Sequence, residues 1–297
     1  MRDMRDMAPS IAVCIPAHNE ASTIGAICHA VSSDLMGGRS PFVDELLVID
    51  DRSEDDTASQ ARDNGAKVVP VAEILPRFQP DKGKGNAMWK AIAATTADIV
   101  VFCDGDLEKF DTHYVTALVE MLLEDQSLVM TKGYYERIYE GDPNGGGRTT
   151  ALMARPALSL FFPHLARINQ PLGGEYAIRR AAAEQVTFVR GWGVEVGLLI
   201  DVAARWGADA IGQVDLGRRT HKHRHLHELS IQASEILHIV LQRAGVPWRA
   251  EWSSLLVRQG FEDIHIKVEE MPPLISVNEY SSAVPDFEIA VSDLDAA

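Results

Sequence analysis

The chain has 297 residues, of which 46% are hydrophobic and 24% charged, and this composition predicts a folded protein with a sizeable core. Its formal net charge of −15 argues against general binding of nucleic acid or of anionic membranes. No apolar run approaches the roughly 18 residues that cross a bilayer, and residues 1–10 lack the apolar core of a signal peptide. We therefore expect a cytoplasmic protein with a disordered leader at residues 1–10 and three buried, reduced cysteines.

Short apolar runs alternate with helical patterns along the first hundred residues. We expect helices at residues 21–32, 55–64 and 85–95, between strands at residues 11–15, 45–49, 67–71 and 98–103. Pro16 is expected to end the first strand, and Gly65 has the position of a helix-ending glycine. Alternating strands and helices form a parallel sheet with right-handed crossovers. The predicted fold class is therefore α/β, with a Rossmann-like, mainly parallel sheet flanked by helices.

An acidic motif, Asp104-Gly105-Asp106, directly follows the fourth predicted strand. Ligands of such sheets bind beyond the carboxyl ends of the strands. Two carboxylates one residue apart offer the oxygen ligands that Mg²⁺ and Mn²⁺ prefer, and such a cation neutralises a diphosphate leaving group. Asp-X-Asp is also a common plain turn, but its place at a strand end favours a metal site.

Three further polar turns accompany the predicted strands. Pro16-Ala17-His18-Asn19-Glu20 follows the first strand, and a run from Asp50 to Thr57 follows the second. Both offer hydrogen-bond acceptors for a nucleobase and a ribose. Gly83-Lys84-Gly85 precedes a helix, where glycines allow close approach and Lys84 supplies a charge for a phosphate. Each turn alone fits a helix entry, a capped turn or a flexible loop; their order along the chain favours a nucleotide site.

Basic residues are concentrated in one later part of this acidic chain. Arg148 follows three glycines, and its guanidinium offers a fork for phosphate or carboxylate. A second basic run, with histidines interleaved, comprises Arg218, Arg219, Lys222 and Arg224. A cationic pocket in an acidic protein suits a small anionic substrate, although a solvated basic face gives the same pattern.

The whole layout resembles the GT-A glycosyltransferases, whose pattern is PA-x-NE, DD-x-S-x-D-x-T and D-x-D. Later segments resemble the glucosyl-3-phosphoglycerate synthases of family GT81: Gly145 to Thr150, Ala154-Arg155-Pro156, Gln170 to Ala177 and Gly193 to Leu199. The resemblance implies a GT-A domain at residues 11–246, with a nucleotide-sugar half at 11–131 and an acceptor-side half at 132–246. Residues 247–297 form a C-terminal extension, with a dimer contact as one possible role. Its tail beyond Met271 is expected to be extended or partner-bound rather than part of the core.

The resemblance also implies a role for each motif residue. The residues implied to bind the donor are Pro16, Ala17, Asn19, Glu20, Asp51, Lys84, Asp104, Gly105, Leu172, Gly173 and Glu175. Acceptor binding falls to Gly147, Arg148, Thr150 and His223, the last standing where an asparagine is usual. Asp106 and His221, with Asp104, would hold the metal, and Glu195 and Asp106 are the catalytic candidates. Asp51-Arg52 stands where relatives often have Ser-Gly, which leaves the nucleobase open.

The function implied is retaining transfer of glucose from UDP-glucose to the 2-hydroxyl of 3-phosphoglycerate by a homodimer that uses Mg²⁺ or Mn²⁺. A mannosyl-3-phosphoglycerate synthase that uses GDP-mannose is the nearest alternative. A sugar-nucleotide-binding protein without turnover and a transferase with a different acceptor are further alternatives. A nucleotidyltransferase would carry a glycine-rich basic loop after the first strand, and a lipid or polysaccharide transferase usually brings a membrane helix or a basic amphipathic stretch. The sequence has neither feature.

Overall fold

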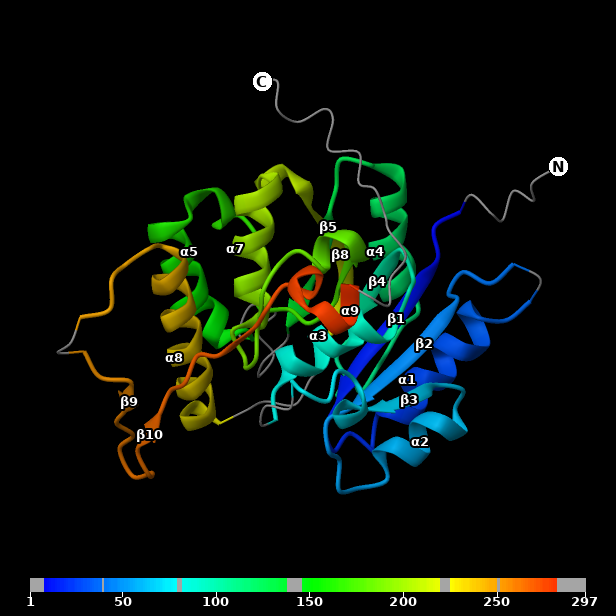
Figure 1. The fold of residues 1–297 in the computed structure, drawn as a ribbon, viewed down its shortest axis with the longest axis horizontal. Coiled ribbons are helices and arrows are strands. Elements are labelled where there is room, and N and C mark those ends of the chain that lie inside the picture. Colours follow the sequence, from blue (N-terminus) through cyan, green and yellow to red (C-terminus); the bar gives the residue numbers. More distant parts are fainter. Residues whose placement is uncertain are drawn as a thin grey trace.

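The computed structural model describes residues 8–38, 40–78, 82–137, 146–219, 225–249 and 252–281. A seven-stranded sheet with the order β3-β2-β1-β4-β6-β5-β8 runs through its centre, with helices on both faces (Figure 1). The strands of this sheet are β1 (Ile11–Ala17), β2 (Glu45–Asp50), β3 (Lys67–Pro70), β4 (Ile99–Phe102), β5 (Met130–Arg137), β6 (Tyr176–Arg179) and β8 (Ile211–Arg219).

The helices and the small sheets complete the chain order. The helices are α1 (Ile24–Ala30), α2 (Thr57–Asp63), α3 (Lys84–Ala94), α4 (His113–Glu124), α5 (Arg155–Phe161), α6 (Arg180–Ala183), α7 (Val194–Trp206), α8 (Leu226–Arg243) and α9 (Asn278–Ser281). Two-stranded sheets join β7 (Phe188–Val189) to β11 (Glu270–Met271) and β9 (Leu255–Leu256) to β10 (Ile264–His265). Within the described ranges, no helix has the length and apolar character needed to cross a membrane.

The strand directions confirm the predicted fold class. β1 pairs in parallel with β2 and β4, β2 with β3, and β5 with β8. Only β6 is reversed in this sheet, because it lies antiparallel to both β4 and β5. The sheet is therefore mainly parallel, and each predicted strand and helix of the first hundred residues is present within a few residues of its expected bounds.

Pro16 does not end β1, contrary to the expectation, because the strand continues to Ala17. The backbone oxygen of Cys14 faces β4, where it accepts from the N–H of Cys103. Two residues later, Pro16 faces the same side, but the pairing of β1 with β4 ends at Cys14. A backbone N–H at position 16 would have no acceptor in β4. Proline, which lacks this N–H, therefore costs the strand no hydrogen bond.

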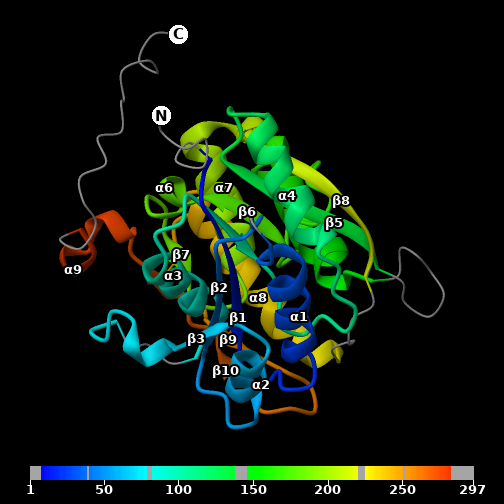
Figure 2. The same ribbon diagram turned by 90° about the vertical axis from the view of Figure 1, so that its right-hand side faces the viewer.

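Each face of the sheet is covered by its own hydrophobic core. Ala12 and Cys14 of β1 face the core formed with α3, α7 and α8, whereas Val13 and Ile15 face the core formed with α1, α2 and α4. Figure 2 shows α1 and α4 on the opposite side of the sheet from α3. Burial on both faces explains why β1 is a continuous apolar run rather than an alternating one.

The expectation for the tail beyond Met271 was wrong for residues 272–280. Met271, Leu274, Val277 and Tyr280 are all buried and belong to the core on the α3 side. The indole N–H of Trp89 also donates to the backbone oxygen of Pro272 at 2.7 Å. The proline- and acid-rich composition concealed apolar residues at every third position, which supply one buried face.

Candidate active site

A cavity of about 480 Å³ lies beyond the carboxyl ends of β1, β2 and β4. Parallel strands bring their carboxyl ends to one edge of a sheet, so turns that are distant in sequence meet there. The cavity is lined by Pro16, Ala17, His18, Glu20, Asp51, Lys82, Gly83, Lys84, Ala87, Asp104, Gly105, Asp106, Gly191, Trp192 and Glu235. The predicted donor motifs thus share one cavity with the acidic motif.

Hydrogen bonds between the first two turns fix one wall of this cavity. Nδ1 of His18 lies 2.9 Å from the backbone oxygen of Asp51, so this nitrogen carries the proton, and Nε2 accepts from the ammonium of Lys82 at 3.2 Å. Asn19 does not line the cavity; its side-chain oxygen accepts from the N–H of Glu54 at 2.8 Å. Asn19 has a φ of 59°, a backbone conformation that asparagine tolerates better than most residues.

Asp51 reaches the cavity with one carboxylate oxygen still available. The residue is 5% exposed, and its Oδ2 accepts from the N–H of Gly83 at 2.9 Å. Oδ1 is buried and has no hydrogen-bond partner among the described residues, although Arg52 lies 3.6 Å from it. A buried carboxylate oxygen in this state can accept one further hydrogen bond from a ligand.

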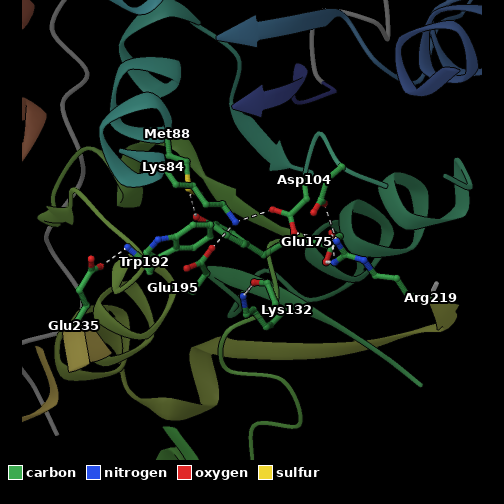
Figure 3. Close-up of polar contacts among 12 residues, drawn as sticks. Lys84, Met88, Asp104, Lys132, Glu175, Trp192, Glu195, Arg219 and Glu235 are labelled. Atoms are coloured by element: carbon green, nitrogen blue, oxygen red, sulfur yellow. Dashed lines mark hydrogen bonds and ion pairs between the residues drawn. The ribbon is translucent and has the colours of Figure 1, made fainter. Parts of the chain in front are cut away.

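A network of buried charges forms the floor of the site (Figure 3). The ammonium of Lys84 lies 2.6 Å from Oδ1 of Asp104 and 2.6 Å from Oε1 of Glu195. The guanidinium of Arg219 lies 3.2 Å from Asp104, 3.2 Å from Asp106 and 2.9 Å from Glu175. Four carboxylates from three separate parts of the chain therefore converge on two cations.

The ion pairs favour the charged forms of Asp104 and Lys84 despite their burial. Burial alone would raise the pKa of the Asp104 carboxyl, but Lys84 and Arg219 hold it well below its usual range. Burial alone would lower the pKa of Lys84, but Asp104 and Glu195 carry it well above its usual value. The lowered pKa favours the carboxylate form of Asp104 at the end of β4.

The comparisons with known proteins point to one family. Residues 12–183 match the model of glycosyl transferase family 2. The glucosyl-3-phosphoglycerate synthase of Petrotoga mobilis is 38% identical over 300 residues, which cover 94% of this chain and 90% of that protein. The chain belongs to the glucosyl-3-phosphoglycerate synthase family of glycosyltransferases.

Other members of this family agree in sequence and in structure. The synthase of Mycolicibacterium smegmatis is 42% identical over 241 residues, which cover 80% of this chain and 78% of that protein. The crystal structure of the Mycobacterium tuberculosis synthase in complex with Mn²⁺, UDP-glucose and phosphoglyceric acid matches with a TM-score of 0.82 and 37% identity. That match covers 91% of this chain and 92% of the other.

Arg219 is one of the residues of this glycosyltransferase site for which sequence analysis predicted no individual role. It stood in a basic run that indicated only an anionic substrate. In the structure its side chain is 4% exposed, and it lies against Glu175, whose side chain is fully buried and also accepts from the hydroxyl of Tyr135 at 2.9 Å. Arg219, Glu175 and Glu195 are not among the residues that line the first cavity. Arg219 and Glu195 contact it only through the lining residues Asp104, Asp106 and Lys84. Alternation of the buried Val214 and Leu216 along β8 would have indicated Arg218, but the register of β8 against β5 shifts before that point and Arg219 is the buried residue, so no signal in the sequence indicated it.

Leu172 and Gly173, the other donor residues of that turn, also lie outside the cavity lining. Their neighbour Gly174 packs directly on the acidic motif, because a β-carbon at Gly174 would lie 2.1 Å from Oδ1 of Asp104. The turn thus supports Asp104 from behind, and only glycine leaves room for that contact.

A second cavity, of about 510 Å³, contains two of the four predicted acceptor residues. Gly147 and Thr150 line it, together with Tyr134, Tyr135, Glu136, Gly146, Ala151, Arg155, Asn169, Gln170 and Asp215. Arg148 lies between these two residues in sequence and is partly buried. Thr149 ties the segment to α8, because its hydroxyl donates to the side chain of Gln232 at 3.1 Å. His221 and His223 lie outside the described residues.

The acidic motif has the chemistry of a divalent-metal site. Asp104 and Asp106 supply the hard oxygen ligands that Mg²⁺ and Mn²⁺ prefer, and Arg219 bridges both carboxylates. Within the described ranges, no third histidine, cysteine or acidic side chain joins them in a metal-binding group. The two carboxylates fit a cation that takes its remaining ligands from a substrate diphosphate and water.

Proposed function

We propose that this glycosyltransferase moves glucose from UDP-glucose to the 2-hydroxyl of 3-phosphoglycerate with retention of configuration. The observation that carries the proposal is that Lys84, Asp104 and Asp106 line one cavity with the predicted donor motifs, with Arg219 paired to both carboxylates. The names of the family's members, and the UDP-glucose and phosphoglyceric acid bound to one of them, support this choice of substrates. We also propose that the enzyme is cytoplasmic, and family resemblance favours a homodimer.

The environment of Asp51 supports a uracil base over a guanine base. Oδ2 of Asp51 is already occupied by the N–H of Gly83, so only Oδ1 remains for a ligand. Uracil presents one N–H between two carbonyl groups, whereas the equivalent edge of guanine presents two neighbouring donors. One available carboxylate oxygen therefore matches uracil, and the second donor of guanine would compete with Gly83.

Charge at the departing diphosphate is offset by residues that are already in position. Lys84 and Arg219 are held by carboxylates and need no reorganisation when the phosphate charge develops. Asp106 and Asp104, with His221 of the undescribed segment, would hold Mn²⁺ or Mg²⁺. When bound, this metal would act as a Lewis acid on the diphosphate oxygens.

In the proposed transfer, the bond between the sugar C1 and the UDP oxygen breaks, and a bond from C1 to the acceptor 2-oxygen forms on the same face. The proton of the acceptor hydroxyl passes to the departing phosphate oxygen, so no enzyme base is consumed. Glu195 is engaged by Lys84 at 2.6 Å, and this contact favours a role in orienting the sugar or the acceptor over that of a free base. Gly147, Arg148, Thr150 and His223 would bind the phosphate and carboxylate of the acceptor.

Turnover with defined donors tests the proposal. Purified protein with Mn²⁺ and 3-phosphoglycerate is given UDP-glucose, GDP-glucose or GDP-mannose, and release of the nucleoside diphosphate is followed. We expect release from UDP-glucose that depends on 3-phosphoglycerate, and an α-glucosyl product in the proton NMR spectrum. Faster release from GDP-mannose would favour the mannosyl alternative, and a β-linked product would exclude retention. UDP-glucose binding without release would indicate a different acceptor or a binding protein.

A further inference from the structure

Lys132 is a third buried cation of the site, and none of the roles above uses it. It lies on β5 and is 1% exposed. Its ammonium donates a hydrogen bond to the backbone oxygen of Gly173 and lies 4.8 Å from the centre of the Tyr176 ring (Figure 3). Unlike Lys84 and Arg219, Lys132 forms no ion pair with a carboxylate in the described part of the chain.

Keeping a charge on Lys132 costs free energy of folding. Burial lowers the pKa of its ammonium to about 8, although Glu195 of α7, Glu175 before β6 and Asp104 after β4 attract the charge. Lys84 of α3 faces it as well and repels it. A methionine has similar length and would fill the same space without this cost. A charged lysine buried beside the site therefore has an explanation other than stability.

The bond from Lys132 fixes the turn that supports the acidic motif. The N–H of Gly133, the next residue of β5, donates to the backbone oxygen of Glu175 at 2.9 Å. Strand β5 therefore holds the turn both at Gly173 and at Glu175, and Gly174 lies between them against Asp104. Because a trans peptide carries its C=O and N–H on opposite sides, the Lys132 bond also sets the direction of the Gly174 N–H.

We propose that Lys132 is a positioning residue for glucosyl transfer: its charged ammonium holds the Gly173–Gly174 peptide against Asp104, and transfer slows when the ammonium loses its proton. The inference rests on the proposed function and adds a residue to it. Loss of the proton replaces a charge-assisted hydrogen bond by a weaker neutral one, and it removes a positive charge that faces Glu195 and Glu175. Both effects loosen the support of Asp104 on the side opposite the donor cavity.

The test compares Lys132→Met with Lys90→Met, a matched control from α3. Lys90 is also 1% exposed, donates to the backbone oxygen of Val71 at 2.7 Å, and has a pKa that burial lowers to about 8. We expect the kcat of the wild type and of K90M to fall as the pH rises through about 8. We expect K132M to lose about 10- to 100-fold in kcat at neutral pH and to show no such fall. The affinity for UDP-glucose with Mn²⁺, measured by calorimetry, should change far less than kcat.

Melting temperatures separate a positioning role from a merely structural one. If Lys132 positions the turn, K132M melts no lower than the wild type although it is less active. A loss of kcat that parallels a lower melting temperature, or a fall above pH 8 that persists in K132M, overturns the proposal. If the wild type does not glucosylate 3-phosphoglycerate, the proposed function fails, and slow hydrolysis of UDP-glucose by water still tests Lys132. Hydrolysis that is equal in K132M and wild type would contradict the positioning role.

Discussion

Arg219 shows how one residue can stabilise the fold and serve the site at once. Its guanidinium neutralises Glu175, whose carboxylate has no exposed surface, and also contacts both carboxylates of the acidic motif. Burial alone would lower the pKa of Arg219, but Glu175 and its neighbours raise it well above its usual value. The stability of this pair and the reactivity of the site are therefore coupled, and a double substitution can separate them.

We expect Arg219→Met to lower the free energy of unfolding by about 3–5 kcal/mol, because it leaves Glu175 buried and unpaired. Adding Glu175→Gln should recover much of this loss, since a neutral amide needs no counter-charge. Turnover should remain low in the double variant, because the guanidinium beside Asp104 and Asp106 is still absent. Urea unfolding and UDP release on the same samples measure both effects. Recovered turnover in the double variant would show that Arg219 acts only through stability.

Asp106 is the residue at which the predicted metal site can be tested, because its side chain is 34% exposed and lines the cavity. Asp106→Ala removes a carboxylate without opening the core, so we expect an unchanged circular dichroism spectrum. Turnover that depends on Mn²⁺ should fall by roughly 100-fold or more, because charge on the departing diphosphate is no longer offset. A Mn²⁺ titration of activity checks this. Wild-type turnover in the variant would refute the assignment of Asp106 as a metal ligand.

At the scale of elements, local patterns predicted the first half of the fold well. Strands β1 to β4 are short apolar runs that end in polar turns, and their parallel order follows from the helices between them. The reversal of β6 was not predictable in this way, because it depends on which neighbours the strand finds, β4 and β5, and not on its own residues. The tail was mispredicted because composition was weighed above the three-residue spacing of its apolar side chains.

The residues of the site likewise fall into those that local sequence patterns predicted and those that they did not. Motifs at strand ends, such as Asp104-Gly105-Asp106, were found because their position along the chain fixes their position on the sheet. Lys132 and Glu235 were missed because their importance comes from contacts with residues far away in sequence. Sequence position alone therefore identifies the ligand-binding edge, but it does not identify the side chains that pack behind it.

Glu235 of α8 lines the first cavity, and it also shapes the start of α7. Its Oε2 accepts from the N–H of Trp192 at 2.6 Å, and a β-carbon at Gly191 would lie 2.4 Å from the same oxygen. Burial raises the pKa of Glu235, although hydrogen bonds from the N–H groups of Trp192 and Gly193 oppose the shift. The turn that leads to Glu195 is thus fitted around a carboxyl group whose pKa is raised by burial.

A raised pKa in the folded state means that the folded protein holds this proton more tightly than the unfolded chain does. The contribution of Glu235 to stability is therefore greatest below its unfolded pKa, near 4.5, and is lost as the pH rises through the folded value. In Glu235→Gln the amide oxygen still accepts from Trp192, and no charge is buried. We expect the melting temperature of E235Q relative to wild type to rise with pH above 4.5. A constant difference between the two proteins across this range would contradict the shift.

At the scale of the whole molecule, the C-terminal segment braces the elements that carry the site. β11 pairs with β7, and the N–H of Arg190, just after β7, donates to the backbone oxygen of Glu269 at 2.9 Å. This strand leads directly to the turn before α7, which carries Glu195. The same segment reaches α3, which begins at Lys84, through the bond between Trp89 and Pro272. The ion pair of Lys84 and Glu195 therefore joins α3 and α7, and the C-terminal segment contacts α3 and the strand that precedes α7.

Leu274 and its neighbour Ile275 test this bracing with a matched pair of substitutions. Leu274 is fully buried in the core on the α3 side, whereas Ile275 is 53% exposed. We expect Leu274→Ala to cost roughly 2–5 kcal/mol through lost burial and the cavity that remains, and Ile275→Ala to cost far less. Differential scanning calorimetry should show a fall in melting temperature of roughly 5 °C or more for L274A.

Turnover measured well below its melting temperature should also fall in L274A, because the spacing between Lys84 and Glu195 loses its support. Equal melting temperatures for the two variants would contradict the burial of the tail. A destabilised L274A with wild-type kcat would show that the tail stabilises the fold without bracing the site.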